Sequence, residues 1–461
     1  MKIAICASEV VPFAKTGGLA DVAGALPQAL SKEGQDAIII MPKYKGIQDK
    51  FKLVKVSDNV IYACLGEKIK VYFIENDAYF NRDSLYTAKT GDYQDNLDRF
   101  SYYSRKALEL LKEIKFKADI LHVHDWQASL IPVYLKTIFG KDAFYKNMRT
   151  LLTIHNMGYQ GLFPREEFPK LGLNWGLFNM EGLEFFGRVN ILKGGLLFSD
   201  IINTVSPTYS REIQSKQFGF GLEGVLSERR DSLFGILNGL DYSIWNPETD
   251  KFIANKFSAK APEGKIKDKE DLQKICSLAV DKDIPLLGMV SRLVEPKGFD
   301  ILCEGIDELC RMKVQVVILG TGDQKYCDIL TRIARKHPKT ISLDLRFDDP
   351  LAHKIYAGSD IFLMPSNYEP CGLGQLIAFK YGSIPLVFKT GGLNDTVNKD
   401  NGFVFDVYNK DVLLETIKRA VTLFKDKKIW AGRIKNAMHL DFSWEKSAKK
   451  YLELYAKAKA K

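Results

Sequence analysis

The segment Lys15-Thr16-Gly17-Gly18-Leu19 combines several features that suit a phosphate ligand. Paired glycines let the backbone approach a ligand closely, and a helical pattern begins directly after them. The start of a helix offers unpaired N–H groups and a positive dipole, and Lys15 adds a positive charge. A Gly-Gly turn before a helix is also an ordinary strand-to-helix connection, so both interpretations stay open.

A second pair of cations, Arg292 and Lys297, lies in the segment VSRLVEPKGFD. Arg292 follows an apolar run that predicts a buried strand, and Lys297 precedes the next predicted helix. Because ligands of open α/β sheets bind outside the carboxyl ends of the strands, these cations could hold a diphosphate and neutralise it as it leaves. The alternative is that they pair with Glu295 or Asp300 on a solvated loop.

The segment YEPCGL follows the apolar run DIFLMP and precedes a helical pattern. It places Glu369, Cys371 and Gly372 at the same type of strand end. A carboxylate there could bind sugar hydroxyls or stabilise positive charge that develops at an anomeric carbon. A glutamate before a proline is more often a surface residue, and Cys371 could be a small packing residue.

Histidines mark the ends of two further predicted strands. His155 closes the run TLLTIH and precedes Asn156, so it is the best placed of the six histidines to contact a ligand, although a lone histidine there is more often structural. In LHVHDW, His122 and His124 share one face of a strand and precede Asp125, which is also a spacing of metal ligands. Because no further cluster of ligands accompanies them, the sequence favours a site without a metal.

The composition narrows the class of protein. The chain has 461 residues, of which 46% are hydrophobic, which is enough for two or three packed domains and excludes a disordered chain. A net charge of +9 over this length favours anionic small molecules over nucleic acid. No run is long enough to cross a membrane, no signal peptide is evident, and the seven cysteines are scattered, so we expect a cytoplasmic protein.

Short apolar runs alternate with helical patterns along almost the whole chain. This alternation predicts an α/β fold with mostly parallel sheets. The turn-rich segment NGLDYSIWNP separates two series of such units, so we predict Rossmann-like domains at 1–238 and 239–442 and a helix at 443–461 that crosses back to the first domain. The predicted strands are 2–7, 37–41, 70–75, 120–124, 150–155 and 201–205, then 285–291, 314–320, 340–345, 361–365, 384–388 and 402–405.

The pentapeptide KTGGL occurs twice, at 15–19 and at 389–393. A chance repeat of five residues is improbable, whereas two doubly wound domains would place such loops at equivalent strand ends. The simplest interpretation is two Rossmann-like domains that face each other across a deep cleft.

Eight segments, taken together, resemble the bacterial glycogen synthase and plant starch synthase family. In chain order they are SEVVPFAKTGGLADVAGALPQAL, HVHDW, TIHNMGYQG, SPTYSREI, GILNGLDYSIWNP, SRLVEPKG, YAGSDIFLMPSNYEPCGLGQL and KTGGLNDTV. The resemblance runs from Met1 to about Tyr455. It implies a glycosyltransferase B-type fold and retaining transfer of glucose, usually from ADP-glucose, to the 4-hydroxyl of an α-1,4-glucan such as glycogen. It also implies that neither a metal nor another cofactor is needed.

The same resemblance assigns roles to individual residues. Arg292 with Lys297 would clamp the diphosphate of the donor, and the backbone carbonyl of His155 would stabilise an oxocarbenium-like transition state. The residues expected in catalysis are His155, Glu369, Arg292, Lys297 and Asp125. The residues expected to bind substrate are Lys15, Gly18, Asp21, Tyr93, Asn156, Asn238, Cys371, Gly372 and Leu373.

Three other functions stay compatible with the residues. A transferase of the same fold could use UDP-glucose or another acceptor, as sucrose-forming relatives do. A glucan phosphorylase shares the fold but carries a pyridoxal cofactor on a lysine. A catalytically inactive glucan-binding relative is the third, and the intact diphosphate clamp argues against it.

Overall fold

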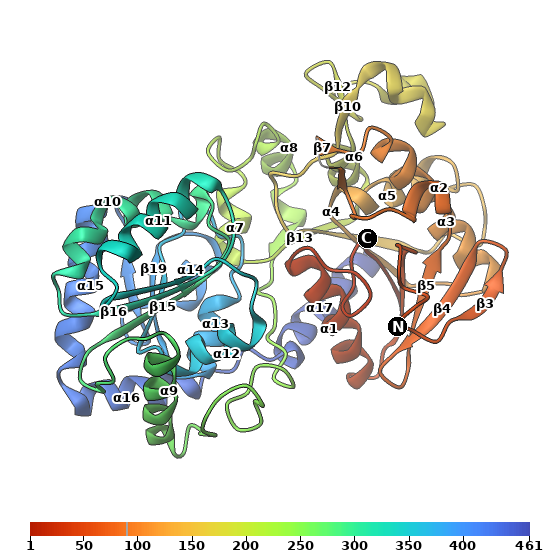
Figure 1. The fold of residues 1–461 in the computed structure, drawn as a ribbon. Helices are drawn as coiled ribbons and strands as arrows, with labels where there is room; N and C mark the ends of the chain where they lie inside the picture. Colours follow the sequence, from red (N-terminus) through yellow and green to blue (C-terminus); the bar gives the residue numbers. More distant parts are fainter. Residues whose placement is uncertain (89–90) are drawn as a thin grey trace. The chain divides into compact units, whose positions relative to one another are not determined.

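The computed structural model describes residues 1–88 and 91–461, and these form two compact units (Figure 1). Unit 1 comprises Met1–Gly239 and Trp444–Lys461, and unit 2 comprises Leu240–Ser443. Each boundary therefore lies one residue beyond the expected one. Gly239 belongs to unit 1 because its α-carbon packs against Trp444, where a Cβ would lie 2.6 Å from the tryptophan ring. Leu240 already pairs with Ser443 in a parallel bridge of unit 2.

Unit 1 is built on a nine-stranded sheet with the order β14-β13-β9-β8-β1-β2-β5-β4-β3. All neighbours from β14 to β5 are parallel, and the β5-β4-β3 edge is antiparallel. The strands are β1 (Lys2–Cys6), β2 (Asp36–Pro42), β3 (Val54–Ser57), β4 (Val60–Leu65), β5 (Ile69–Ile74), β8 (Ile120–His124), β9 (Arg149–Ile154), β13 (Ile201–Thr204) and β14 (Leu233–Gly235).

Smaller elements complete the β-structure of unit 1. A three-stranded antiparallel sheet has the order β10-β12-β11, and β6 pairs with β7. The predicted strands of this unit correspond to the long parallel strands, whereas β3, β4, β14 and these small sheets were not predicted. The bounds are β6 (Thr87–Ala88), β7 (Gly91–Asp92), β10 (Leu162–Pro164), β11 (Glu184–Phe185) and β12 (Arg188–Asn190).

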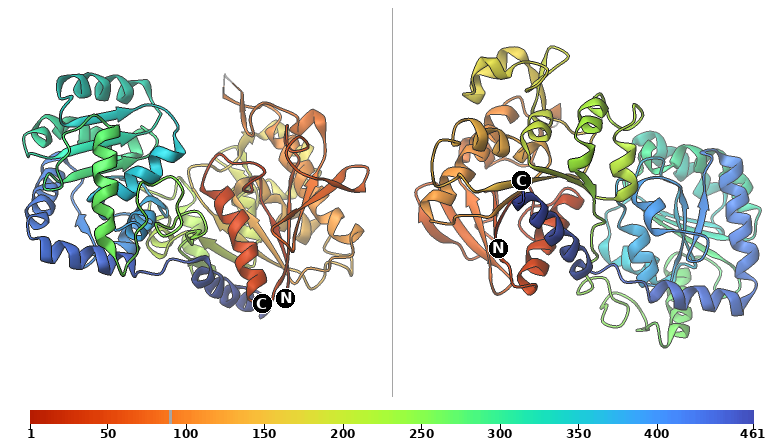
Figure 2. Two further views of the ribbon diagram at one scale, coloured as in Figure 1. Left: turned by 60° about the horizontal axis from the view of Figure 1, so that its bottom comes forward. Right: turned by 180° about the vertical axis from the view of Figure 1, so that it is seen from behind.

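The C-terminal helix α17 is part of unit 1. It packs against α1 and against strands β8, β9 and β13, and Figure 2 shows α17 and α1 side by side in both views. Its apolar face buries Tyr451 and Tyr455 completely. The helices are α1 (Gly18–Lys32), α2 (Asp77–Phe80), α3 (Asn96–Glu113), α4 (Asp125–Ala128), α5 (Leu130–Thr137), α6 (Ile191–Phe198), α7 (Pro207–Glu212), α8 (Glu223–Glu228) and α17 (Trp444–Lys459).

Unit 2 contains a six-stranded, fully parallel sheet with the order β17-β16-β15-β18-β19-β20. Numbered within the unit this is 3-2-1-4-5-6, the order of a doubly wound Rossmann sheet. Its strands match the six predicted ones within two residues at each end. They are β15 (Leu286–Val290), β16 (Gln315–Leu319), β17 (Ile341–Asp344), β18 (Ile361–Met364), β19 (Ile384–Phe388) and β20 (Phe403–Phe405).

Helices cover both faces of the unit 2 sheet. The consecutive residues Leu286 and Leu287 of β15 point to opposite faces of the sheet and enter two different buried clusters. This is expected for a parallel sheet without a solvent face. No helix in the described ranges is both long and apolar enough to span a bilayer. The unit 2 helices are α9 (Lys265–Ile275), α10 (Phe299–Cys310), α11 (Gln324–Lys336), α12 (Asp349–Gly358), α13 (Gly374–Lys380), α14 (Gly391–Thr396), α15 (Lys410–Phe424) and α16 (Lys427–Met438).

Candidate active site

The large sheet of each unit has a point where the chain changes direction across the sheet, and several of the predicted site residues follow the strands there. In unit 1 this point lies between β1 and β8, because the chain continues from β1 to β2 on one side and later returns to β8 on the other. In unit 2 it lies between β15 and β18. Such switch points open a crevice at the carboxyl ends of the strands, where ligands of doubly wound sheets bind.

Glu9 organises the long loop after β1. It is 3% exposed, and its carboxylate accepts hydrogen bonds from the Thr16 hydroxyl at 2.6 Å and from the Gly17 N–H at 3.2 Å. The Thr16 N–H also donates to this carboxylate, and the Tyr86 hydroxyl donates to it at 2.7 Å. Glu9 was not among the predicted site residues, although a charged residue within the apolar run ASEVVPFA was the available signal.

The two KTGGL segments use their glycines differently. A Cβ added to Gly17 or Gly18 would meet no atom within 4 Å, so the protein's own packing does not require glycine there. A Cβ on Gly391 would lie 2.1 Å from the Glu369 carbonyl oxygen, and one on Gly392 would lie 2.0 Å from the Cys371 carbonyl oxygen. The first pair therefore leaves an open surface at a helix start, whereas the second pair lets two loops pack together.

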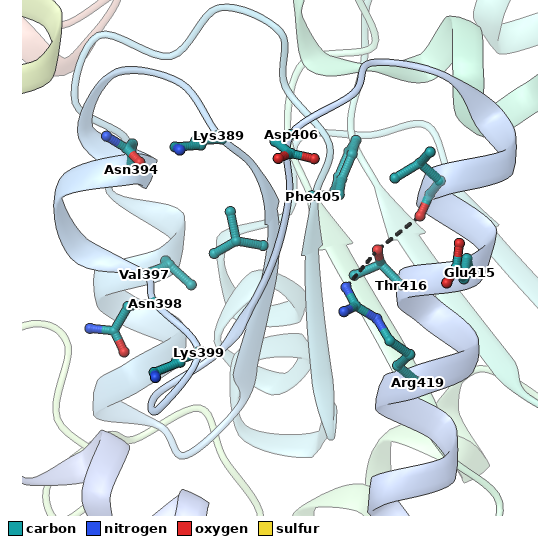
Figure 3. A pocket seen from close by; sticks show the side chains of 12 residues that line it. Lys389, Asn394, Val397, Asn398, Lys399, Phe405, Asp406, Glu415, Thr416 and Arg419 are labelled. Atoms are coloured by element: carbon teal, nitrogen blue, oxygen red, sulfur yellow. Dashed lines mark hydrogen bonds between the residues drawn. The ribbon is translucent and has the colours of Figure 1, made fainter.

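The predicted equivalence of the two segments is wrong. The first lies in the loop after β1, the first strand of its sheet, whereas the second directly follows β19, the fifth strand of unit 2. A hollow of about 550 Å³ lies beside the second segment, between α14 and α15 (Figure 3). Its lining mixes the cations Lys389, Lys399 and Arg419 with the carboxylates of Asp406 and Glu415, so its charges favour no single class of ligand.

This difference predicts opposite effects for two alanine substitutions. Gly392→Ala should lower the thermal midpoint by several degrees, because the new methyl group collides with a backbone carbonyl that cannot move alone. Gly18→Ala should leave the midpoint within about 2 °C but weaken binding of the nucleotide sugar that the resemblance implies, because the methyl group occupies the open surface. Differential scanning calorimetry with and without ADP-glucose measures both effects. Equal destabilisation by the two substitutions would contradict the assignment.

Lys15 lies at the edge of this open surface. Its ammonium is 2.8 Å from the carboxylate of Asp21, and the two side chains are 55% and 33% exposed. A surface ion pair of this type contributes little to stability because water and salt screen it. The lysine can therefore exchange this partner for a phosphate at little energetic cost.

Asp125 joins the loops after β8 and β9. Its Oδ1 accepts a hydrogen bond from the backbone N–H of His155 at 2.7 Å, and its backbone has a positive φ of 53°. Such a backbone is strained in a residue other than glycine and is frequent at functional sites. Burial raises the pKa of Asp125 to about 7, with repulsion from Glu9 adding to the rise and hydrogen bonds from the backbone of His155 and Asn156 opposing it.

This shift predicts a pH dependence of stability. The folded pKa of Asp125 lies above its unfolded value, so between about pH 4 and pH 7 the folded state binds more protons than the unfolded state. The contribution of Asp125 to stability is therefore greatest below pH 4 and is lost as the pH rises to about 7. Urea unfolding of the wild type and Asp125→Asn from pH 4 to pH 8 should show the variant gaining relative stability across this window. A difference in unfolding free energy between the two proteins that stays constant with pH would contradict the raised pKa of Asp125.

The ring of His155 has a hydrogen-bond partner at its Nε2 atom. Its Nε2 lies 2.9 Å from Nδ1 of His124, and burial lowers the pKa of His155 to about 3. The ring is therefore neutral near pH 7, and it can orient a ligand by hydrogen bonding without supplying charge.

The remaining predicted residues of unit 1 lie around these loops in different ways. The guanidinium groups of Arg82 and Arg99 lie over the Tyr93 ring, 4.6 and 5.0 Å from its centre. The side chain of Asn156 accepts a hydrogen bond from the N–H of Gly158 at 2.8 Å. Asn238 is buried, and its Oδ1 has no hydrogen-bond partner within residues 1–88 and 91–461.

In unit 2, Lys297 and Glu369 meet across the switch point. The ammonium lies 2.5 Å from Oε2 of the carboxylate, which also accepts a hydrogen bond from the Ser366 hydroxyl at 3.2 Å. The alternative pairing of Lys297 with Asp300 is wrong, because Asp300 instead accepts a hydrogen bond from the Tyr408 hydroxyl at 2.6 Å. The loops after β15 and β18 therefore bring a cation and a carboxylate into one place.

Arg292 and the YEPCGL segment follow β15 and β18, the two strands at this switch point. Arg292 is exposed at the end of β15, and its guanidinium has no partner in the part of the chain that the structure describes. Cys371 is 5% exposed, Gly372 has a positive φ of 73°, and Leu373 is the N-cap residue of α13. A guanidinium after one of these strands and a helix start after the other both suit an anionic ligand.

Comparisons with known proteins agree over the full length of the chain. The starch synthase catalytic domain family matches residues 2–228, and the glycosyl transferases group 1 family matches residues 272–437. A glycogen synthase of Geotalea daltonii is 47% identical over 100% of this chain and 99% of its own length. A glycogen synthase of Thermosipho melanesiensis is 47% identical over the whole of both chains. The chain belongs to the glycogen synthase family.

Solved structures of the family and its neighbours extend this result to the fold. The catalytic domain of starch synthase IV from Arabidopsis thaliana, bound to ADP and acarbose, superposes with a TM-score of 0.90 at 34% identity, covering 100% of this chain and 99% of that one. Sucrose-phosphate synthase from Thermosynechococcus elongatus gives 0.63 at 16% identity, covering 100% and 99% of the two chains, which shows the fold alone. This member of the glycogen synthase family is thus a glycosyltransferase with the two-domain B-type fold, as predicted.

Proposed function

We propose that this glycosyltransferase transfers glucose from ADP-glucose to the 4-hydroxyl of an α-1,4-glucan with retention of configuration, releasing ADP. The observation that carries the proposal is the 47% identity to glycogen synthases over the full chain. The ADP and acarbose bound to the starch synthase IV domain support a nucleotide donor and a glucan-like acceptor.

The proposed role of the cations is to bind the diphosphate and stabilise its growing charge. Arg292 and Lys297 supply fixed positive charge at the unit 2 switch point, and Lys15 with the open Gly17 and Gly18 backbone supplies a further phosphate-binding group in unit 1. The leaving ADP gains negative charge as the bond from the anomeric carbon to its phosphate oxygen breaks. These groups can carry that charge, so the reaction is proposed to need no metal.

Retention is proposed to occur by substitution on one face of the sugar. The 4-hydroxyl oxygen of the acceptor forms the new bond to the anomeric carbon, and its proton passes to the phosphate oxygen of the departing ADP. The backbone carbonyl of His155 is proposed to stabilise the positive charge of the sugar, and Glu369 to lie beside it. A double displacement would need a carboxylate nucleophile on the opposite face.

The location proposed for this reaction is the cytoplasm. The seven cysteines form no disulfide, as is typical of proteins in a reducing compartment.

The function is tested with purified protein, maltooligosaccharide and either ADP-glucose or UDP-glucose, in the presence of a chelator. We expect release of ADP and elongated glucan chains from ADP-glucose, with full activity under chelation. Activity with UDP-glucose alone would identify UDP-glucose as the donor in place of ADP-glucose. Loss of activity under chelation that returns with a divalent metal would refute the metal-free mechanism. Absence of transfer despite glucan binding would favour an inactive relative.

A further inference from the structure

A row of three histidine rings runs inward from the candidate site of unit 1. His124 Nδ1 lies 2.9 Å from His155 Nε2, and the ring of His124 lies 4.2 Å from that of His122, centre to centre. His122 is held at both nitrogens, with the Tyr455 hydroxyl 2.8 Å from Nδ1 and the Thr153 hydroxyl 2.7 Å from Nε2. His122 and His124 have no exposed surface, whereas His155 is half-buried.

We propose that His124 is a positioning residue that sets the tautomer of His155, so that Nδ1 of His155 carries the proton and donates it in a hydrogen bond to the bound sugar. This inference rests on the proposed function only in identifying the ligand of His155 as a sugar. The tautomer itself follows from contacts within unit 1.

The contact between the two rings requires a proton on one, and only one, of the two facing nitrogens. Burial lowers the pKa of His155 to about 3 and that of His124 well below its usual value, so both rings are neutral at pH 7. Each neutral ring carries a proton on one nitrogen only. At 2.9 Å, either His124 Nδ1 donates to His155 Nε2 or the reverse holds.

The second nitrogen of His124 decides between these two arrangements. Its Nε2 is buried and has no hydrogen-bond partner among residues 1–88 and 91–461. If the proton were on this atom, a buried N–H donor would be unsatisfied, and such donors are rarer in proteins than unsatisfied acceptors. The proton therefore belongs on Nδ1 of His124, which donates to Nε2 of His155.

The consequence for His155 is a fixed donor. With Nε2 accepting from His124, the single proton of the neutral His155 ring is on Nδ1. A sugar hydroxyl can donate or accept, so a fixed donor on the protein selects one orientation of that hydroxyl. The other tautomer would present a lone pair and select the opposite orientation.

The tautomer can be read directly by NMR. The chain has only six histidines, so selective ¹⁵N-histidine labelling and long-range ¹H–¹⁵N correlation can distinguish protonated from unprotonated ring nitrogens. Signals are assigned with single histidine variants. We expect Nδ1 of both His155 and His124 to be protonated in the wild type. A protonated Nε2 in His155 would overturn the proposal.

Three variants separate positioning from structural support. His124→Phe removes the donor, His124→Asn restores an N–H near the position of Nδ1, and His122→Phe is the matched control, because His122 is equally buried but has no hydrogen bond to His155. We expect His124→Phe to lose the single His155 tautomer and to lower kcat by about tenfold with a smaller change in KM, the effect of losing one hydrogen bond. His124→Asn should restore both properties.

The control variant should retain the His155 tautomer even if its thermal midpoint falls. Loss of kcat in His124→Phe with an unchanged His155 tautomer, or an equal change of tautomer in His122→Phe, would overturn the positioning role. If the wild type transfers no glucose, the proposed function fails, but the NMR spectrum of the wild type still decides the tautomer.

Discussion

Replacing Glu369 by Gln is expected to lower kcat by about 10²- to 10³-fold. The substitution keeps the size of the side chain but removes the charge that faces Lys297 at 2.5 Å. Lys297 then has no anionic partner at this position, and the sugar would lose the carboxylate that is proposed to lie near its developing positive charge. Steady-state kinetics with ADP-glucose and maltooligosaccharide measures the loss, and no glycosyl-enzyme should accumulate.

A matched substitution and a double-mutant cycle sharpen this test. Glu295→Gln removes an exposed carboxylate from the neighbouring β15 loop and should leave kcat unchanged. Because Lys297 and Glu369 form one ion pair, Lys297→Met combined with Glu369→Gln should lose less activity than the sum of the single losses. Strict additivity, or a trapped covalent intermediate, would contradict the proposed roles.

Replacing Arg292 by Ala is expected to cost about 2 to 4 kcal/mol of transition-state stabilisation, or roughly 30- to 1,000-fold in kcat/KM. No described residue pairs with its guanidinium, so the loss should come from ligand interactions and not from folding. The kinetic constants and the thermal midpoint are measured together.

The control for Arg292→Ala is Arg311→Ala, which removes an exposed arginine at the end of α10 in the same unit. Its kinetics should match the wild type. Lys15→Ala should show a loss of kcat/KM similar to that of Arg292→Ala. This loss should not come from unfolding, because the surface pair of Lys15 with Asp21 contributes little to stability. Unchanged kinetics in both Lys15→Ala and Arg292→Ala would refute the assignment of these residues to the donor.

The parallel strands could be predicted from the sequence because they are buried on both faces. Runs such as LLGMV in β15 and QVVIL in β16 are almost wholly apolar, and helical patterns separate them. The β3 and β4 hairpin escaped prediction because its strands are partly exposed and carry lysine, serine and tyrosine between apolar residues. The short strands β10 to β12 give too few residues for any periodic pattern.

The individual site residues could be chosen from the sequence, but their partners could not. Lys297 and Glu369 are 72 residues apart, and their ion pair depends on β15 and β18 being neighbours in the sheet. The contact between His124 and His155 similarly depends on the register that places His124 beside Thr153. Neither pairing has a local sequence signal.

The KTGGL segments show how far a shared motif can be interpreted. Their identical letters suggested equivalent places in two similar domains. The structure instead places Gly17 and Gly18 beside open space and Gly391 and Gly392 against backbone carbonyls. Sequence identity over five residues does not reveal which atoms approach the glycines.

The most direct test of the proposed reaction follows the transferred sugar itself. ADP-glucose labelled with ¹³C at the anomeric carbon is incubated with the enzyme and a maltooligosaccharide, and the product is examined by NMR. We expect the label in a new α-1,4-linked residue at the non-reducing end, with one ADP released for each residue added. Label in a β-linked residue, at another hydroxyl or only in released glucose would contradict retaining transfer to the 4-hydroxyl of a glucan.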